Sequence, residues 1–223
     1  MNHKLDYILE LYSKHKNQLI EAKNFSLSSK SRCNFKPMFD DLENEITFLL
    51  NLENKPDKIV EFSPAYGWST ITLCLAVKNN NKGKVFTYDI QDQCVHNLNE
   101  IGLNNYFIFK KGDVTSEFHT FFDADYIFID SDHSSNFAHN YINNLIKPIL
   151  SSQRKTVFCI HDVFHTDRLN EEGNVVQNFL QNSKIPYFSP RYNFDILTKH
   201  KEKLGINIQL HNSTKNPSVF FNF

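Results

Sequence analysis

The sequence has little cysteine, and its cysteines stand far apart. Only four of the 223 residues are cysteine: Cys33, Cys74, Cys94 and Cys159. Zinc sites and dithiol redox motifs need closely spaced pairs, which these four do not form. We therefore expect reduced thiols, most of them buried.

The chain also lacks long apolar runs and an excess of charge of either sign. It has no run of about 18 apolar residues, the length that a membrane-spanning helix needs. Its first residues, MNHKLDYILELYSKHKNQ, are charged throughout, unlike a signal peptide. Lysine and arginine number 24 against 25 aspartate and glutamate, so no global positive field attracts a polyanion. We expect a cytoplasmic protein without a membrane or nucleic-acid partner.

What the chain does have is a regular alternation of strand and helix patterns. Its 40% hydrophobic residues, with 21 Phe and 9 Tyr, suffice for the core of one domain. Short β-rich runs, several almost continuously apolar, are typical of strands buried on both faces. These runs occupy residues 58–62, 84–89, 106–110, 125–130 and 156–161.

Helical patterns separate these strands, at residues 68–78, 92–101, 116–122 and 136–149. Parallel neighbours need crossover connections, which are usually helical. The alternation therefore predicts an α/β fold, a Rossmann-like, doubly wound and mostly parallel sheet.

The N-terminal part follows a different pattern. Leu5, Ile8 and Tyr12 recur at helical spacing, whereas the polar, serine-rich residues 24–34 break that pattern and predict a mobile loop. We expect residues 1–38 to form a helix and a lid-like segment. The main domain, residues 39–223, then opens with an amphipathic helix.

Beyond Asp162 the pattern predicts a helix at 174–182 and a terminal strand at 217–223. Residues 206–210 alternate between apolar and polar and are expected to pair with that strand. These elements complete a seven-stranded sheet with an antiparallel C-terminal edge. The basic run 199–203 is read as a solvated face, with recognition of an anion as the alternative.

The first strand exit is rich in small residues. Ligands of open α/β sheets bind beyond the carboxyl ends of the strands. The chain here reads IVEFSPAYGWST: Glu61 lies in the strand, Ser63 and Gly67 are small, and Ser69 opens a helix whose free N–H groups can receive a ligand. An ordinary tight turn between strand and helix is the alternative.

The next two exits carry carboxylates. Asp89 ends its strand about 20 residues beyond Gly67, where a carboxylate can accept both hydroxyls of a ribose. Asp113 follows the third strand, where adenine commonly lies in such folds. Each aspartate is equally suited to cap the next helix. Together the three exits predict a site with the shape of adenosine.

The fourth and fifth exits read IDSDHS and VFCIHDVF. If their strands are adjacent, as a right-handed helical crossover favours, an oxygen- and nitrogen-rich cluster results. Its members are Asp130, Asp132, His133, His161 and Asp162. The alternative is a set of capping and hydrogen-bonding residues in a site without metal.

These successive exits resemble the motifs of class I S-adenosylmethionine-dependent methyltransferases, over roughly residues 39–164. The D-x-D-H segment with a later H-D pair is similar to the branch that includes sugar and small-molecule O-methyltransferases. The resemblance implies S-adenosylmethionine as cofactor. It also implies a small hydroxylated acceptor: a sugar, a nucleotide-sugar or another polyhydroxy compound.

The resemblance implies a cofactor site that runs along the first three exits, from the methionine moiety to ribose and adenine. In that order its residues are Glu61, Ser63, Gly67 and Ser69, then Asp89, then Asp113 with Val114.

For the second cluster the resemblance implies a divalent metal that binds the acceptor hydroxyls. Mg²⁺ suits carboxylates and waters, and the candidate ligands are Asp130, His161 and Asp162. His133 or His161 would take the hydroxyl proton, with Asp130 as the base if no metal is bound.

One departure from the family pattern keeps another class open. The first loop of the family usually carries two or three glycines, whereas Ser63 and Ala65 stand at the first two positions here. A noncatalytic methyltransferase-fold partner or regulatory subunit is therefore the main alternative. An NAD(P)-dependent oxidoreductase is disfavoured, because the chain has neither G-x-G-x-x-G nor a plausible Tyr and Lys pair. The acceptor and the oligomeric state, including a homo-oligomer, are left open.

Overall fold

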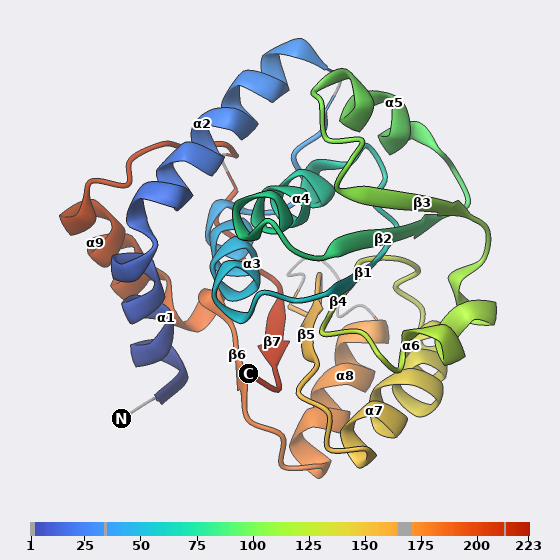
Figure 1. The fold of residues 1–223 in the computed structure, drawn as a ribbon. Helices are drawn as coiled ribbons and strands as arrows, with labels where there is room; N and C mark the ends of the chain where they lie inside the picture. The colour runs from blue at the N-terminus through green and yellow to red at the C-terminus, as the bar shows by residue number, and fades with distance from the viewer. Residues whose placement is uncertain (1–2, 34, 165–170, 212) are drawn as a thin grey trace.

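The computed structural model describes residues 3–33, 35–164, 171–211 and 213–223, and in it helices cover both faces of a seven-stranded sheet (Figure 1). The strand order is β3-β2-β1-β4-β5-β7-β6. The strands are β1 Lys58–Phe62, β2 Lys84–Asp89, β3 Phe107–Lys111, β4 Tyr126–Ile129, β5 Val157–Ile160, β6 Tyr187–Phe188 and β7 Val219–Phe221.

The predicted Rossmann-like sheet is confirmed. Strands β1 to β5 are paired in parallel, and β7 runs antiparallel to both β5 and β6. The bounds of the first five strands agree with prediction to within one residue at each end. The order reverses at β1, whose neighbours are β2 and β4, so the exits of β1 and β4 flank the switch point where such sheets bind ligands.

The apolar runs arise because the central strands are buried on both faces. On β4, Tyr126 and Phe128 contribute to one core, while Ile127 and Ile129 contribute to the other. Successive side chains of a strand point to opposite faces, so a strand with a core on each side needs an apolar residue at every position.

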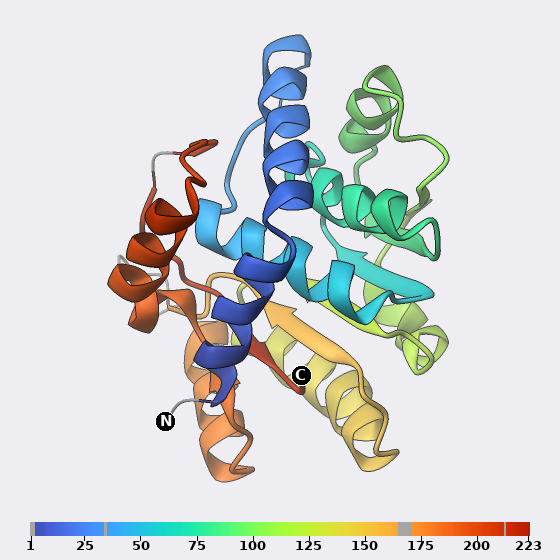
Figure 2. The same ribbon diagram turned by 60° about the vertical axis from the view of Figure 1, so that its left-hand side comes forward.

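Helices form the outer layers. The first core packs under α3 Asp41–Asn54, α4 Trp68–Asn80 and α5 Gln93–Glu100. The second packs under η1 Val114–Phe121, α6 Ser135–Tyr141, η2 Ile142–Ile146, α7 Lys147–Ser151 and α8 Glu171–Asn182. Three further helices lie outside α3 and α4 or beside them: α1 His3–Lys14, α2 Lys16–Arg32 and α9 Phe194–Leu204 (Figure 2). A short 3₁₀ helix, η3 Pro190–Asn193, precedes α9.

The predicted loop at residues 24–34 is wrong, because α2 continues to Arg32. The serines fit a helix here: Ser26 Oγ donates to the carbonyl of Ala22 and Ser29 Oγ to that of Phe25, each four residues back. The polar side chains that break the apolar pattern are therefore satisfied locally, which a count of hydrophobic spacing does not detect.

A buried ion-pair network joins helices from both ends of the chain to α3. Glu45 of α3 is 1% exposed and accepts hydrogen bonds from Lys23 of α2, Lys201 of α9 and Tyr12 of α1. Lys201 belongs to the basic run that was expected to be solvated. Its ammonium instead lies against a buried carboxylate, so this residue ties α9 to α3.

The C-terminal pairing was also predicted wrongly. Residues 206–210 form no strand, and β7 pairs with β5 and with the two-residue strand β6. The N–H of Leu210 instead donates to the carboxylate of Asp41. Strand β6 lies between Pro186 and Pro190 and is too short to give a periodic signal. Across the described ranges, no helix has the length and apolarity to cross a membrane.

Candidate active site

The loop between β1 and α4 is held in an unusual backbone conformation. Ser63, Ala65 and Gly67 all have positive φ, at 57°, 47° and 92°. For a residue with a side chain, the left-handed region costs roughly 1–2 kcal/mol. The positions at which the family pattern expects glycine are thus filled by residues with side chains that adopt the left-handed conformation glycine favours. Strain of this kind is typical of sites where the loop shape serves a ligand.

Glu61 holds the loop from beneath. Its fully buried carboxylate accepts hydrogen bonds from Ser69 Oγ at 2.6 Å and Thr70 Oγ1 at 2.8 Å, in the first turn of α4. Burial raises the pKa of Glu61 to about 7. Gly67 begins α4, and a Cβ there would lie 3.2 Å from Cys94 Cβ. Glu61, Gly67 and Ser69 therefore shape the loop from behind and do not line the cavity in front of it.

That cavity, of about 670 Å³, lies along the exits of β1 to β4. Its size is within the range of pockets for small ligands and cofactors. Four of the seven predicted cofactor residues line it: Ser63, Asp89, Asp113 and Val114. The structure therefore brings together residues from three strand exits, as the adenosine-shaped site requires.

The two predicted carboxylates are fixed by backbone groups. Asp89 accepts the N–H of Ala65 at 3.2 Å and that of Gln91 at 3.0 Å, so it links the β2 exit to the strained loop. Asp113 accepts the N–H and the hydroxyl of Thr115 at 2.9 and 2.8 Å and caps η1. The capping alternative thus holds for Asp113, which lines the cavity as well.

A second cluster lies at the exits of β4 and β5, which are adjacent as predicted. His161 Nδ1 is 3.2 Å from Asp130 Oδ1 and 3.5 Å from Asp162 Oδ1. One ligand atom from each of the three residues lies within 4.8 Å of the others. Asp162 has a φ of 56°, a third left-handed residue with a side chain at this edge of the sheet.

His161 is buried between carboxylates. Its Nε2 lies 3.5 Å from Oε2 of Glu43, at the start of α3, and neither ring nitrogen has a well-directed hydrogen bond. Burial alone lowers the pKa of His161, but Asp130 and Glu43 raise it well above its ordinary value. Burial raises the pKa of Asp130, but His161 and His133 outweigh this and hold it below its ordinary value.

His133 belongs to the same cluster and has a partner of its own. Its Nε2 lies 3.6 Å from Asp162 and 3.9 Å from Asp130, and its Nδ1 lies 2.7 Å from Glu172 Oε2 on α8. The hydrogen bond to Glu172 raises the pKa of His133, and burial raises the pKa of Glu172. Asp132, by contrast, accepts the N–H and hydroxyl of Ser134 and is a local cap.

Two carboxylates in this cluster, Glu43 and Glu172, were not found from the sequence. Neither follows a strand, so the strand exits gave no reason to select them. Glu43 did leave a signal, since it forms a capping box with Asp40 at the start of a helix that the sequence predicts. For Glu172 the sequence holds no comparable signal.

The cofactor cavity and the second cluster are connected. Ser63 Oγ donates to Ser131 Oγ at 2.9 Å, which joins the first loop to the residue that follows Asp130. Ser131 and Asp132 line the cavity as well. A ligand in the cavity therefore lies next to the Asp130–His161–Asp162 group.

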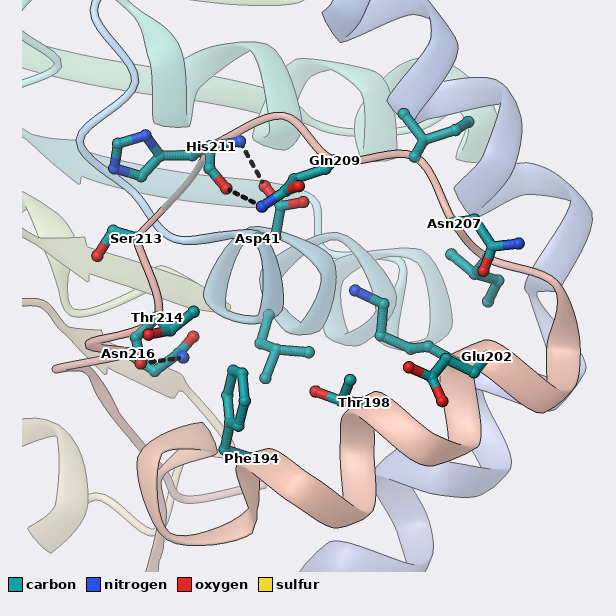
Figure 3. A pocket seen from close by; sticks show the side chains of 14 residues that line it. Asp41, Phe194, Thr198, Glu202, Asn207, Gln209, His211, Ser213, Thr214 and Asn216 are labelled. Carbon is teal, nitrogen blue, oxygen red and sulfur yellow. Dashed lines mark hydrogen bonds between the residues drawn. The ribbon is translucent and has the colours of Figure 1, made fainter.

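Another cavity, of about 290 Å³, lies between α9, residues 206–211 and 213–216, and the start of α3 (Figure 3). Asp41 accepts the N–H groups of Leu210 and His211 there and holds the C-terminal segment against α3. The predicted site residues do not line this cavity. Its hydrogen bonds serve the packing of the C-terminal segment.

The part of the chain that forms the site matches a known protein family. Residues 60–163 match the model of a family described as a methyltransferase domain, just under half of the chain. This match spans all five strand exits that build the site. Among curated proteins, no sequence matches the chain.

Solved structures of similar fold include cofactor-bound Rv0187 from MTB, with 15% identity, a TM-score of 0.59 and coverage of 90% of this chain and 89% of the other. The O-methyltransferase TomG from Streptomyces achromogenes, in complex with SAM, has 17% identity, a TM-score of 0.55 and coverage of 76% and 82%. An O-methyltransferase from Bacillus cereus in complex with SAH has 15% identity, a TM-score of 0.55 and coverage of 92% and 90%.

Strand order and solved structures define the fold of the chain as that of Rossmann-like methyltransferases. Within it, residues 60–163 are similar to a methyltransferase domain.

Proposed function

We propose that this chain is an S-adenosylmethionine-dependent enzyme of the cytoplasm that methylates a hydroxyl group of a small polyhydroxy acceptor, which is a sugar, a nucleotide-sugar or a related compound. A divalent metal would be held at Asp130, His161 and Asp162. The observation that carries the proposal is the position of this group, directly beside the cavity that Ser63, Asp89 and Asp113 line. The similar structures of O-methyltransferases from Streptomyces achromogenes and Bacillus cereus support a hydroxyl acceptor.

The donor set fits a metal ion. His161 Nδ1 is buried without a hydrogen-bond partner and faces two carboxylates, and a cation between them would give this nitrogen a partner. Two carboxylates with open positions for water suit Mg²⁺, although the imidazole would also accept Mn²⁺. When bound, such an ion makes an acceptor hydroxyl more acidic and fixes its position.

The residues of the chain divide the remaining work. Asp89 and Ser63 would hold the cofactor in the cavity, while Glu61 and Ser69 keep the loop in place from behind. Methyl transfer from a sulfonium is an in-line displacement, so alignment of oxygen, carbon and sulfur supplies much of the rate enhancement. His133 Nε2 would take the hydroxyl proton, because it is half-exposed and faces Asp130 and Asp162.

The test is calorimetric titration with S-adenosylhomocysteine, with and without Mg²⁺. The variants are Asp89→Ala, Asp162→Ala and, as matched control, Asp92→Ala, an exposed acid paired with Lys111 outside the cavity. We expect S-adenosylhomocysteine to bind with micromolar affinity and to bind more weakly in Asp89→Ala alone. We expect heat of Mg²⁺ binding in all proteins except Asp162→Ala. These outcomes justify a screen of polyhydroxy acceptors.

Absence of binding up to millimolar S-adenosylhomocysteine would contradict the proposal. It would favour the noncatalytic partner protein, for which the strained, glycine-poor loop is the supporting feature. Cofactor binding without measurable heat from Mg²⁺ would contradict only the proposed metal site, and His133 or Asp130 would remain as the base.

A further inference from the structure

A chain of three hydrogen-bonded side chains leads from the core to His133. Tyr141 Oη donates to Glu172 Oε1 at 2.9 Å, and Glu172 Oε2 lies 2.7 Å from His133 Nδ1. Glu172 is 1% exposed and Tyr141 is fully buried, whereas the His133 side chain is 38% exposed. A buried carboxylate with two hydrogen-bond partners thus lies beneath an imidazole that reaches the surface of the site.

The backbone adds a further bond to the same arrangement. The N–H of Glu172 donates to the carbonyl of His133 at 3.1 Å, so α8 is attached to the loop after β4 at both main chain and side chain. Glu171 also accepts the hydroxyl of Ser135 at 3.0 Å. The start of α8 therefore fixes both the position and the orientation of the His133 ring.

A carboxylate is acceptor-only, so its partner nitrogen must carry the proton. With Nδ1–H donated to Glu172, the neutral ring leaves Nε2 bare, and Nε2 is the nitrogen that faces Asp162 and Asp130. This is the same division of roles that orients the histidine of hydrolytic triads, with Tyr141 holding the carboxylate in turn.

We propose that Glu172, held by Tyr141, is a positioning residue that fixes the tautomer and ring orientation of His133, so that Nε2 faces the Asp130–Asp162 side of the site as a proton acceptor. The inference rests on the proposed function, because it gives His133 the role of base. Glu172 itself lies beneath the ring and would act only through it.

Nitrogen NMR of protein labelled with ¹⁵N in its histidines tests the tautomer directly. Spectra are recorded at a pH high enough to leave the His133 ring neutral, and His133→Asn assigns the signals. We expect the proton of wild-type His133 on Nδ1 and an unprotonated Nε2. A wild-type ring with its proton on Nε2 overturns the proposal without any variant.

Three variants then separate positioning from packing. Glu172→Ala should lose the Nδ1–H form, whereas Glu172→Gln should keep it, because its amide oxygen can still accept from Nδ1 while its amide nitrogen donates to Tyr141. Tyr141→Phe should keep the tautomer but broaden the His133 signals. If Glu172→Ala folds and His133 retains the Nδ1–H form, Glu172 does not select the tautomer and the proposal fails.

Titration with S-adenosylhomocysteine in the same samples keeps the two proposals apart. Glu172 does not line the cofactor cavity, so affinity should change by less than twofold in Glu172→Gln. Loss of cofactor binding in the wild type would contradict the proposed function while leaving the tautomer result intact. A wild-type His133 ring that carries its proton on Nε2, in protein that binds the cofactor normally, would contradict the positioning role alone.

Discussion

The cofactor half of the site, at the exits of β1 to β3, and the charged half, at the exits of β4 and β5, are formed by different kinds of interaction. At the exits of β1 to β3, the cavity depends on backbone shape: two residues with side chains hold left-handed conformations, and aspartates are fixed by main-chain N–H groups. At the exits of β4 and β5, the site depends on charge, with two histidines set among four carboxylates. Under the proposed function, backbone shape would bind the cofactor, which is common to many enzymes, and ionisable groups would specialise the acceptor half.

The largest expected effect tests the charged half. His133→Asn removes the proposed base and should lower the rate of methyl transfer by about 10²–10⁴-fold. Affinity for S-adenosylhomocysteine should stay the same, because His133 does not line the cofactor cavity. The measurement is single-turnover transfer to an acceptor found in the polyhydroxy screen.

His139→Asn is the matched control for that prediction, since His139 is an exposed histidine on α6. It should leave both quantities unchanged. Equal rates in the two variants would remove His133 from the chemistry and shift the role of base to Asp130 or His161.

The next largest effect concerns Glu61, an ionisable residue beneath the loop of the cofactor half. Its pKa is about 7 in the folded chain against 4.5 as the ordinary value. The folded protein therefore keeps a proton that the unfolded chain loses, and wild-type stability should fall by about 3 kcal/mol as the pH rises from about 4.5 through 7. Glu61→Gln cannot ionise and should escape this loss.

Urea unfolding of wild type and Glu61→Gln at pH 5 and pH 8 measures the difference. From pH 5 to pH 8 the free energy of unfolding of Glu61→Gln should rise relative to that of the wild type. Glu100→Gln, a change at an exposed position, should show no such relative rise. Parallel curves for all three proteins would show that Glu61 is ionised in the folded state, with its charge stabilised by Ser69 and Thr70.

A third prediction compares two aspartates within the cofactor half. Asp89→Asn should weaken S-adenosylhomocysteine binding by about 10- to 100-fold, the loss expected for hydrogen bonds to a charged group. Asp113→Asn should weaken it only a few-fold, because asparagine caps a helix nearly as well and Asp113 is engaged with Thr115. Calorimetry gives both values, and a reversed order would mean that Asp113 holds the ribose.

The sequence predicted the parallel sheet and the strand exits because both follow from local patterns. A parallel strand buried on both faces is apolar throughout, and the residue after it must lie at the carboxyl edge. Asp130, His161 and Asp162 could therefore be placed together once β4 and β5 were taken as neighbours.

Glu43 and Glu172 could not be placed in this way. Each lies on a helix, and its contact with a histidine depends on how α3 and α8 pack against the sheet. Lys23 and Lys201 show the same limit, because two lysines that look like surface residues meet the buried carboxylate of Glu45. Charges that satisfy one another inside the fold leave no periodic signal in the sequence.

The smallest expected effect examines whether the strained loop matters to binding. Ala65→Gly should stabilise the protein by about 0.5–1 kcal/mol, since relief of the left-handed conformation outweighs the greater entropy of glycine in the unfolded chain. Lys55→Gly, at a φ of 49° beyond the end of α3, offers similar relief far from the cavity and serves as control.

The two glycine variants should differ only in cofactor affinity. The N–H of Ala65 donates to Asp89, so a looser loop should weaken S-adenosylhomocysteine binding by about two- to threefold in Ala65→Gly and leave it unchanged in Lys55→Gly. Denaturation and calorimetry on the same preparations give both quantities. A gain in stability without a loss of affinity would mean that the strain at Ala65 is not needed to hold Asp89, and that the cavity is shaped by Glu61 and α4 alone.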